Sequence, residues 1–236
     1  MCTVSFVNNN GVVIITSNRD EKIIRPGALA PRSYYLNGKN VMYPKDSKAG
    51  GTWFAVDESG TVLVLLNGGI KKHNPVFLYR KSRGLIALDI ISSSSPKDFW
   101  NEINLEDIEP FTLVLYQDEE LYELIWDGFT KWKTLLDVNT NHIWSSVTLY
   151  SEEIRKRRSE WFLDFLRDKN EISPLDMLDF HRNTQRDDSE NGLIINRENT
   201  LKTLSVTQVV IKQNKGTMSY YDLIKTKDFS TSFTSI

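Results

Sequence analysis

The chain has 236 residues, of which 40% are hydrophobic and 25% are charged, a composition typical of globular proteins and not of disordered, collagenous or membrane proteins. Its 29 Lys and Arg residues nearly balance its 31 Asp and Glu residues, so the formal net charge of -2 gives no general attraction to nucleic acid or anionic lipid. Cys2 is the only cysteine, which excludes an intrachain disulfide and a metal site built from several thiolates.

We expect a single domain over residues 1–236, because no linker rich in Gly, Ser or Pro divides the chain. No apolar run approaches the length of a signal-peptide h-region or the ~20 residues of a membrane span. These features predict a cytoplasmic protein without integral membrane association.

The first predicted element is a hairpin in which two strands rich in β-branched side chains flank an Asn-Asn-Asn-Gly turn. A turn centred on the second and third Asn sets Cys2 opposite Ser17. If the second strand continues past Ser17, alternation places Arg19 on the face of Cys2 and places Asn18 and Asp20 on the other face, and a bend there could bring Asp20 back.

The later elements are predicted from periodicity, caps and turn residues. The segment Lys22–Gly51 holds three prolines and little periodicity, and it predicts a long ordered loop. The predicted strands are Cys2–Val7, Val12–Ser17, Thr52–Val56, Thr61–Leu66, Phe111–Tyr116, Leu121–Trp126, Thr130–Leu135, Leu204–Ile211 and Thr217–Leu223. The predicted helices are Leu85–Ile91, Pro96–Ile103, one capped by Ser151, and one from Ser173–Pro174 to about His181. This order predicts an α+β fold in which helices cover antiparallel sheets.

The N-terminus is the first place where chemistry is expected. An initiator methionine is normally removed when the next side chain is small, so we expect a mature chain that begins with Cys2. Cys2 would then carry a thiol and a free α-amine with a reference pKa near about 8, and the amine can serve as the base that activates the thiol. The structural alternative is a small side chain that is simply packed.

Asn18-Arg19-Asp20-Glu21 follows the second predicted strand and begins beside this N-terminus. Arg19 could lower the thiol pKa or bind a substrate carboxylate, and Asp20 could orient the α-amine. The alternative is a paired, charged cap at the end of a strand, since charged clusters are more often structural than catalytic.

Four motifs follow one another along the chain: Met1-Cys2-Thr3, Asn18-Arg19-Asp20-Glu21, Gly50-Gly51-Thr52-Trp53 and Thr148-Leu149-Tyr150-Ser151. In this order they resemble the NRDE family, also called the transport and Golgi organisation protein 2 family. The resemblance implies an αββα sandwich of two mostly antiparallel sheets covered by helices, similar to the N-terminal nucleophile (Ntn) hydrolases. The similarity is especially to the cysteine branch that includes choloylglycine hydrolases and penicillin V acylases, in which an N-terminal Cys cleaves amide bonds with the help of an Arg and an Asp. Cys2, Arg19 and Asp20 match these three.

Four further residues complete the candidate site. Asn67, at a strand end, is matched by the resemblance to an Asn that stabilises the oxyanion, and its alternative is a turn residue of Asn-Gly-Gly. Trp53 either lines a ligand pocket or packs in the core, with the preceding glycines allowing a close backbone approach. Lys71 is a candidate for contacting an acidic ligand, and Asn18 is the remaining candidate for binding substrate.

The remaining sequence patterns indicate a solvent-exposed helix face and give no sign of a metal or nucleotide site. The run Arg155-Lys156-Arg157-Arg158 is interpreted as the solvated face of an amphipathic helix. The three histidines are isolated and neither GxGxxG nor a P-loop occurs, so no metal site and no nucleotide cofactor are predicted.

Two functions remain open on the sequence. The first is a Cys2-dependent hydrolase of an amide or related acyl bond in a small molecule. The second, implied by the resemblance, is a non-catalytic carrier of haem, acyl-CoA or lipid, with eukaryotic relatives linked to secretion and Golgi organisation. Either function predicts a small-molecule ligand and no nucleic acid.

Overall fold

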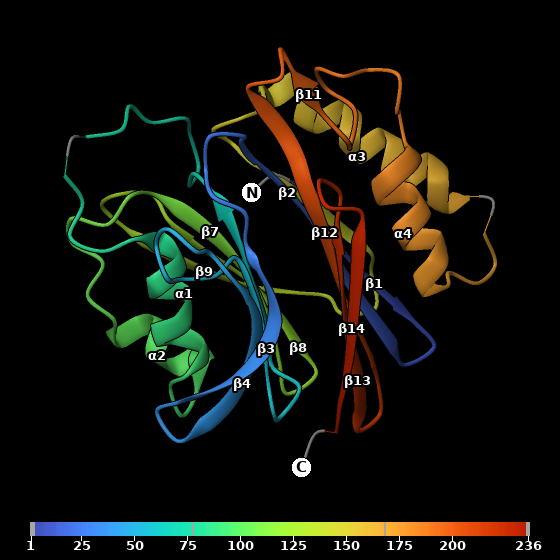
Figure 1. Cartoon of the computed structure of the whole chain (residues 1–236). Coiled ribbons are helices and arrows are strands. Elements are labelled where there is room, and N and C mark those ends of the chain that lie inside the picture. The colour runs from blue at the N-terminus through green and yellow to red at the C-terminus, as the bar shows by residue number, and fades with distance from the viewer. Residues whose placement is uncertain (1–2, 77, 168, 235–236) are drawn as a thin grey trace. The chain divides into compact units, whose positions relative to one another are not determined.

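The structure, a computed structural model, describes residues 3–76, 78–167 and 169–234. Contacts divide the chain into two compact units (Figure 1). The first unit consists of the chain up to Arg25 together with the segment from Asn139 to Phe233, and the second consists mainly of the segment from Pro26 to Val138. Each unit is built on an antiparallel sheet that two helices pack against, so the predicted α+β class is confirmed.

The first unit holds the sheet that carries the N-terminal strand. Its strands are β1 (Thr3–Asn9), β2 (Val12–Lys22), β10 (His142–Ser145), β11 (Asn196–Arg197), β12 (Leu201–Lys212), β13 (Lys215–Asp222) and β14 (Lys227–Thr234). They lie in the order β10-β1-β2-β12-β13-β14, and β11 pairs with β12. Strand β2 is therefore internal, bonded to β1 on one side and to β12 on the other, and most of its residues are buried.

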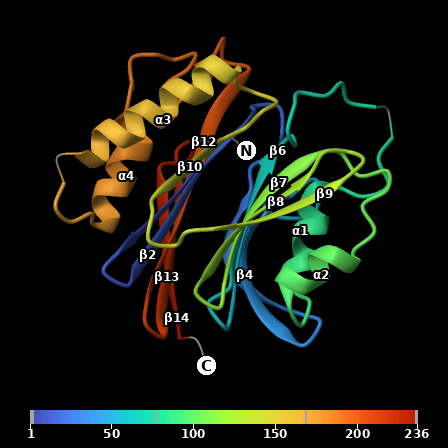
Figure 2. The same ribbon diagram turned by 180° about the vertical axis from the view of Figure 1, so that it is seen from behind.

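Two helices cover one face of this sheet, α3 (Glu152–Arg167) and α4 (Pro174–Asn183) (Figure 2). The Ser151 hydroxyl accepts from the first turn of α3, and Ser173 forms a capping box at the start of α4, so both predicted starts are confirmed. Phe162 of α3 and Phe180 of α4 pack on Ile14 of β2, which fixes the helices to the sheet.

The register of the first hairpin differs from the prediction. Asn10 and Gly11, with φ of 52° and 79°, form a two-residue turn, so the turn lies one residue later than expected. Val4, not Cys2, lies opposite Ser17, and Thr3 lies opposite Asn18. Because the register differs by two residues, every side chain keeps the face that strand alternation gave it.

The second unit holds a meander. Its strands are β3 (Leu29–Leu36), β4 (Lys39–Lys45), β5 (Phe54–Asp57), β6 (Val62–Asn67), β7 (Phe111–Gln117), β8 (Glu120–Trp126) and β9 (Lys131–Leu136), which pair in chain order. The helices α1 (Arg83–Ile91) and α2 (Pro96–Glu102) pack against β5, β6 and β7. The predicted β5–β6 hairpin, the predicted helices and the later meander are confirmed.

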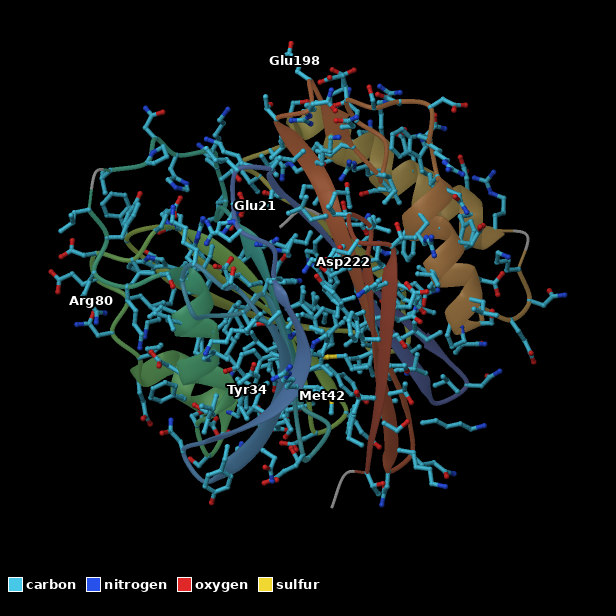
Figure 3. The ribbon with its side chains drawn as sticks, in the orientation of Figure 1. Glu21, Tyr34, Met42, Arg80, Glu198 and Asp222 are labelled. Carbon is cyan, nitrogen blue, oxygen red and sulfur yellow. The ribbon has the colours of Figure 1, made fainter. Side chains whose placement is uncertain are left out.

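The predicted loop Lys22–Gly51 is wrong, because the segment contains the β3–β4 hairpin. Asn37-Gly38, with φ of 48° and 88°, forms the turn, which is a typical hairpin signal. Strand β3 is an edge strand with many exposed residues, and Pro31 lies at an irregularity in its register. Tyr34 on β3 and Met42 on β4 are labelled in Figure 3.

The motif Gly50-Gly51-Thr52-Trp53 receives a structural explanation. A Cβ atom at Gly51 would lie 2.3 Å from the backbone carbon of Gly84, so only glycine allows the segment before β5 to approach the start of α1 this closely. The Thr52 amide donates to the Gly84 carbonyl oxygen at 3.1 Å. The close approach predicted for this motif is thus made to the protein's own backbone.

Candidate active site

Three candidate residues lie in sequence at the end of β2. Asn18, Arg19 and Asp20 are 0%, 3% and 2% exposed, and they lie on β2, which is paired on both sides. Asn18 lies opposite Thr3 and faces the helices, as does Asp20, whereas Arg19 points to the opposite face of the sheet. The side chains of these three consecutive residues therefore lie in two different environments, one on each face of the sheet.

The Asp20 carboxylate is held by two hydroxyl groups from distant parts of the chain. Tyr150 donates to its Oδ2 and Thr203 donates to its Oδ1, each at 2.6 Å. The Thr203 hydroxyl also accepts from the Ile195 amide at 2.9 Å, so its proton is directed at Asp20. Hydrogen bonds to an ionised carboxylate are the stronger kind, and here they fix both of its oxygens.

Arg19 lies in a polar cluster on the other face of the sheet. Ser205 is opposite both Arg19 and Asp222 in the strand register, so these three side chains share a face. Tyr220 belongs to the same cluster: burial raises its pKa, and the charges of Asp222 and Arg19 act on it in opposite directions. Asp222, labelled in Figure 3, ends β13.

Asn18 connects β2 with the helices through a buried histidine. Its amide nitrogen donates to the carbonyl oxygens of His181 at 3.0 Å and Leu193 at 2.7 Å, so its Oδ1 faces His181 Nδ1. His181 Nδ1 therefore carries the proton, and Nε2 accepts from the Ser5 hydroxyl at 2.7 Å. Burial, with a smaller effect of the Arg158 charge, lowers the pKa of His181 to about 3.

The orientation of the Asn18 side-chain amide can be tested by the substitution Asn18→Asp, which changes only the nitrogen of that amide. In Asn18→Asp an oxygen replaces the nitrogen that donates to two buried carbonyl oxygens, and we expect the free energy of unfolding to fall by about 3 kcal/mol. Urea unfolding measures it. Asn9→Asp is the control, because Asn9 makes a single partly buried amide bond, to the Ile172 carbonyl oxygen. Equal losses in both variants would contradict the orientation.

Cys2 lies outside the described residues. Thr3, to which it is bonded, begins β1, and Arg158 of α3 donates to the Thr3 hydroxyl at 2.5 Å. Arg158 is 0% exposed, so the interpretation of the run Arg155-Lys156-Arg157-Arg158 as surface is wrong for its last member. The other three residues are exposed or half-buried, as expected for the outer face of α3.

The remaining candidates belong to the second unit. Asn67 ends β6 opposite Phe111 and is half-buried, just before Gly68 at a φ of 90°. Trp53 is 3% exposed and its carbonyl oxygen accepts from the Leu65 amide. Lys71 is exposed in the segment between β6 and α1.

Sequence reasoning missed Tyr150, Thr203 and Arg158, which the structure brings together around Thr3 and Asp20. The sequence does hold a signal for Tyr150, because this residue lies in the motif Thr148-Leu149-Tyr150-Ser151. Among the described residues, no three His, Cys, Asp or Glu side chains are placed to hold a metal ion. Nor does any helix in the described ranges combine the length and apolar character needed to cross a membrane.

In fold, the chain is similar to N-terminal nucleophile hydrolases of known structure. It matches the Caenorhabditis elegans ortholog of N-acylethanolamine-hydrolyzing acid amidase with a TM-score of 0.62 and 11% identity, over 88% of this chain and 92% of that one. It matches a mutant of the conjugated bile acid hydrolase from Clostridium perfringens with a TM-score of 0.57 and 9% identity, over 98% and 92% of the two chains. A further variant of that hydrolase gives a TM-score of 0.51 at 8% identity, over 99% and 97%.

The family model for Transport and Golgi organisation 2 matches residues 1–222. The chain therefore belongs to this family, and the resemblance found in its four motifs is confirmed. Among curated protein sequences no match was found.

Proposed function

We propose that this protein is an N-terminal cysteine hydrolase of an amide or related acyl bond in a small molecule, with Cys2 as nucleophile. The observation that carries the proposal is the burial of two consecutive charged residues of β2, Arg19 and Asp20, directly after Asn18, which lies opposite Thr3. The fold, shared with an acid amidase and a bile acid hydrolase that both act on small molecules, supports it.

The proposed reaction uses groups that lie at or near the N-terminus. The α-amine of Cys2 accepts the thiol proton while sulfur attacks the carbonyl carbon. The leaving amine takes that proton as the C–N bond breaks, which leaves a thioester on Cys2. Water then hydrolyses the thioester, so the acid is released and the thiol is restored.

Arg19 and Asp20 are given different roles in this proposal. Asp20, whose two oxygens are fixed by Tyr150 and Thr203, orients the α-amine. Arg19, on the opposite face of β2, supplies positive charge for the thiolate or for a substrate carboxylate. Asn67 as the oxyanion donor remains a prediction, as does substrate binding by Asn18, Trp53 and Lys71.

Several expectations from the sequence also remain predictions. They are a single domain over residues 1–236, a cytoplasmic location, and the alternative of a haem, acyl-CoA or lipid carrier linked to trafficking.

A substrate panel tests the proposal directly. Purified protein is incubated with N-acylethanolamines, conjugated bile acids and simple N-acyl amino acids, and release of free amine is measured. We expect at least one amide to be cleaved, with cleavage lost when iodoacetamide alkylates Cys2, and an intact mass that lacks Met1. Unchanged cleavage by the alkylated protein would end the proposal. Tight binding of haem or acyl-CoA, unaffected by alkylation and without cleavage of any amide, would favour the carrier.

A further inference from the structure

Arg158 is a buried cation in the middle of a surface helix. Its side chain is fully shielded from solvent, whereas Arg157 beside it is exposed. Its guanidinium donates to the Thr3 hydroxyl and to the Gly192 carbonyl oxygen, each at 2.5 Å, and to the Asn191 carbonyl oxygen at 3.0 and 3.2 Å. Burying a charged group costs free energy unless the group is well hydrogen-bonded, and most of the N–H donors of Arg158 are used in these hydrogen bonds. One of its bonds reaches the first described residue of the N-terminal strand.

Tyr150 connects this cation to Asp20. The Arg158 guanidinium carbon lies 3.6 Å from the centroid of the Tyr150 ring, a close cation–π contact. The Arg197 guanidinium is also near this ring, at 5.1 Å, and Arg197 donates to the Leu149 carbonyl oxygen at 3.3 Å. The Tyr150 hydroxyl donates to Asp20 at 2.6 Å. A continuous series of contacts thus runs from Thr3 through Arg158 and Tyr150 to Asp20.

We propose that Tyr150 and Arg158 are positioning residues that hold Asp20 and the N-terminal strand in register for the nucleophile Cys2. This inference rests on the proposed function and adds two residues to it. Arg158 fixes Thr3, the residue bonded to Cys2, and Tyr150 fixes the carboxylate that orients the α-amine. Arg158 also places a buried positive charge next to Thr3, the residue bonded to Cys2, which favours the thiolate form of Cys2 over the thiol.

Sequence separation and the demands of the reaction explain why the site needs positioning residues. Asp20 and Tyr150 are 130 positions apart, and Thr3 and Arg158 are 155 apart, so only tertiary contacts can set their distances. A thiol and its base must be aligned within a fraction of an ångström to react, and a misplacement of about 1 Å can cost on the order of 100-fold in rate. Two bonded side chains from α3 and the segment before it supply that alignment.

The test compares Tyr150→Phe with Tyr221→Phe. Phenylalanine keeps the ring under Arg158 and removes only the hydroxyl that donates to Asp20. Tyr221 is a matched control, because it also lies below an arginine, Arg182, with 5.8 Å between guanidinium and ring. We expect Tyr150→Phe to lower kcat on the order of 10- to 100-fold with KM within about twofold, and Tyr221→Phe to leave both unchanged.

A second readout needs no turnover. Cys2 is the only cysteine, so the mass gained with iodoacetamide reports its alkylation alone, and the pH midpoint of the alkylation rate follows its thiolate. We expect this midpoint to rise in Tyr150→Phe and further in Arg158→Met. It should return toward the wild-type value in Arg158→Lys, which keeps the charge. Arg157→Met, on the exposed side of the same helix, should leave the midpoint in place.

The outcomes separate the two proposals. If Tyr150→Phe matches Tyr221→Phe in kcat and in alkylation midpoint, the positioning role is wrong while the hydrolase stands. If alkylated wild-type protein keeps its turnover, the hydrolase is wrong, and the midpoints of the folded Tyr150→Phe chain still decide whether Tyr150 acts on Cys2. A shift in Tyr150→Phe and Arg158→Met that is absent from both controls supports the inference.

Discussion

A protein carrying Cys2→Ala should fold as the wild type does and cleave the substrate of the native protein at a rate lower on the order of 10⁴-fold or more. Alanine has no atom that can form the thioester, and the remaining groups can only bind and polarise the amide. The measurement is kcat on the amide identified in the substrate panel, with urea unfolding as the check on folding. Alanine at position 2 also allows removal of Met1, so processing is held constant.

Two companions sharpen this result. Cys2→Ser keeps a small residue and a nucleophile, but the hydroxyl ionises far less readily than a thiol, so its activity should fall between those of wild type and Cys2→Ala. A chain with an uncleaved N-terminal extension keeps the thiol and converts the α-amine to an amide, and we expect it to lose turnover as well. Full activity of the extended chain would exclude the α-amine as base, and full activity of Cys2→Ala would exclude a Cys2-dependent hydrolase.

Strand alternation and turn residues predicted much of the fold, because they act locally. The β5–β6 hairpin and the β7–β8–β9 meander follow from alternating apolar residues between polar turns. The hairpin of β3 and β4 was missed because many side chains on its edge strand face solvent and leave no apolar alternation to detect. Its turn, Asn37-Gly38, is a hairpin signal in the sequence, whereas the three prolines of the segment favour a loop.

The site was predictable only where neighbours in sequence are neighbours in space. Asn18, Arg19 and Asp20 occupy one strand, and alternation assigned their faces correctly even though the hairpin register was off by two residues. Arg158 could not be found in this way. Its helix has an apolar stripe that includes Phe162, and nothing in the local pattern shows that a cation on this helix meets Thr3 and the Gly192 carbonyl oxygen.

The buried His181 should make the stability of this protein strongly dependent on pH. Desolvation lowers its pKa to about 3 in the folded state, against an ordinary value of 6.5 in the unfolded chain. Between these two values the unfolded chain binds a proton that the folded protein excludes, so stability rises with pH. The contribution is complete above about pH 6.5 and is lost as pH falls, at up to about 1.4 kcal/mol per pH unit and about 4 kcal/mol in total near pH 3.

His181→Gln isolates this effect, because glutamine cannot take up the proton. We measure the free energy of unfolding in urea from pH 6 to pH 4. As the pH falls, we expect this free energy to decrease less steeply in His181→Gln than in wild type, and the difference in slope should correspond to about one proton. His142→Gln, the same substitution at a half-buried histidine of the same sheet, is the control for the change of side chain itself. The neutral, Nδ1-protonated His181 is what lets Asn18 accept from its ring and Ser5 donate to it. Parallel slopes for His181→Gln and wild type would therefore contradict both the protonation state and the hydrogen-bond directions that join β1, β2 and α4.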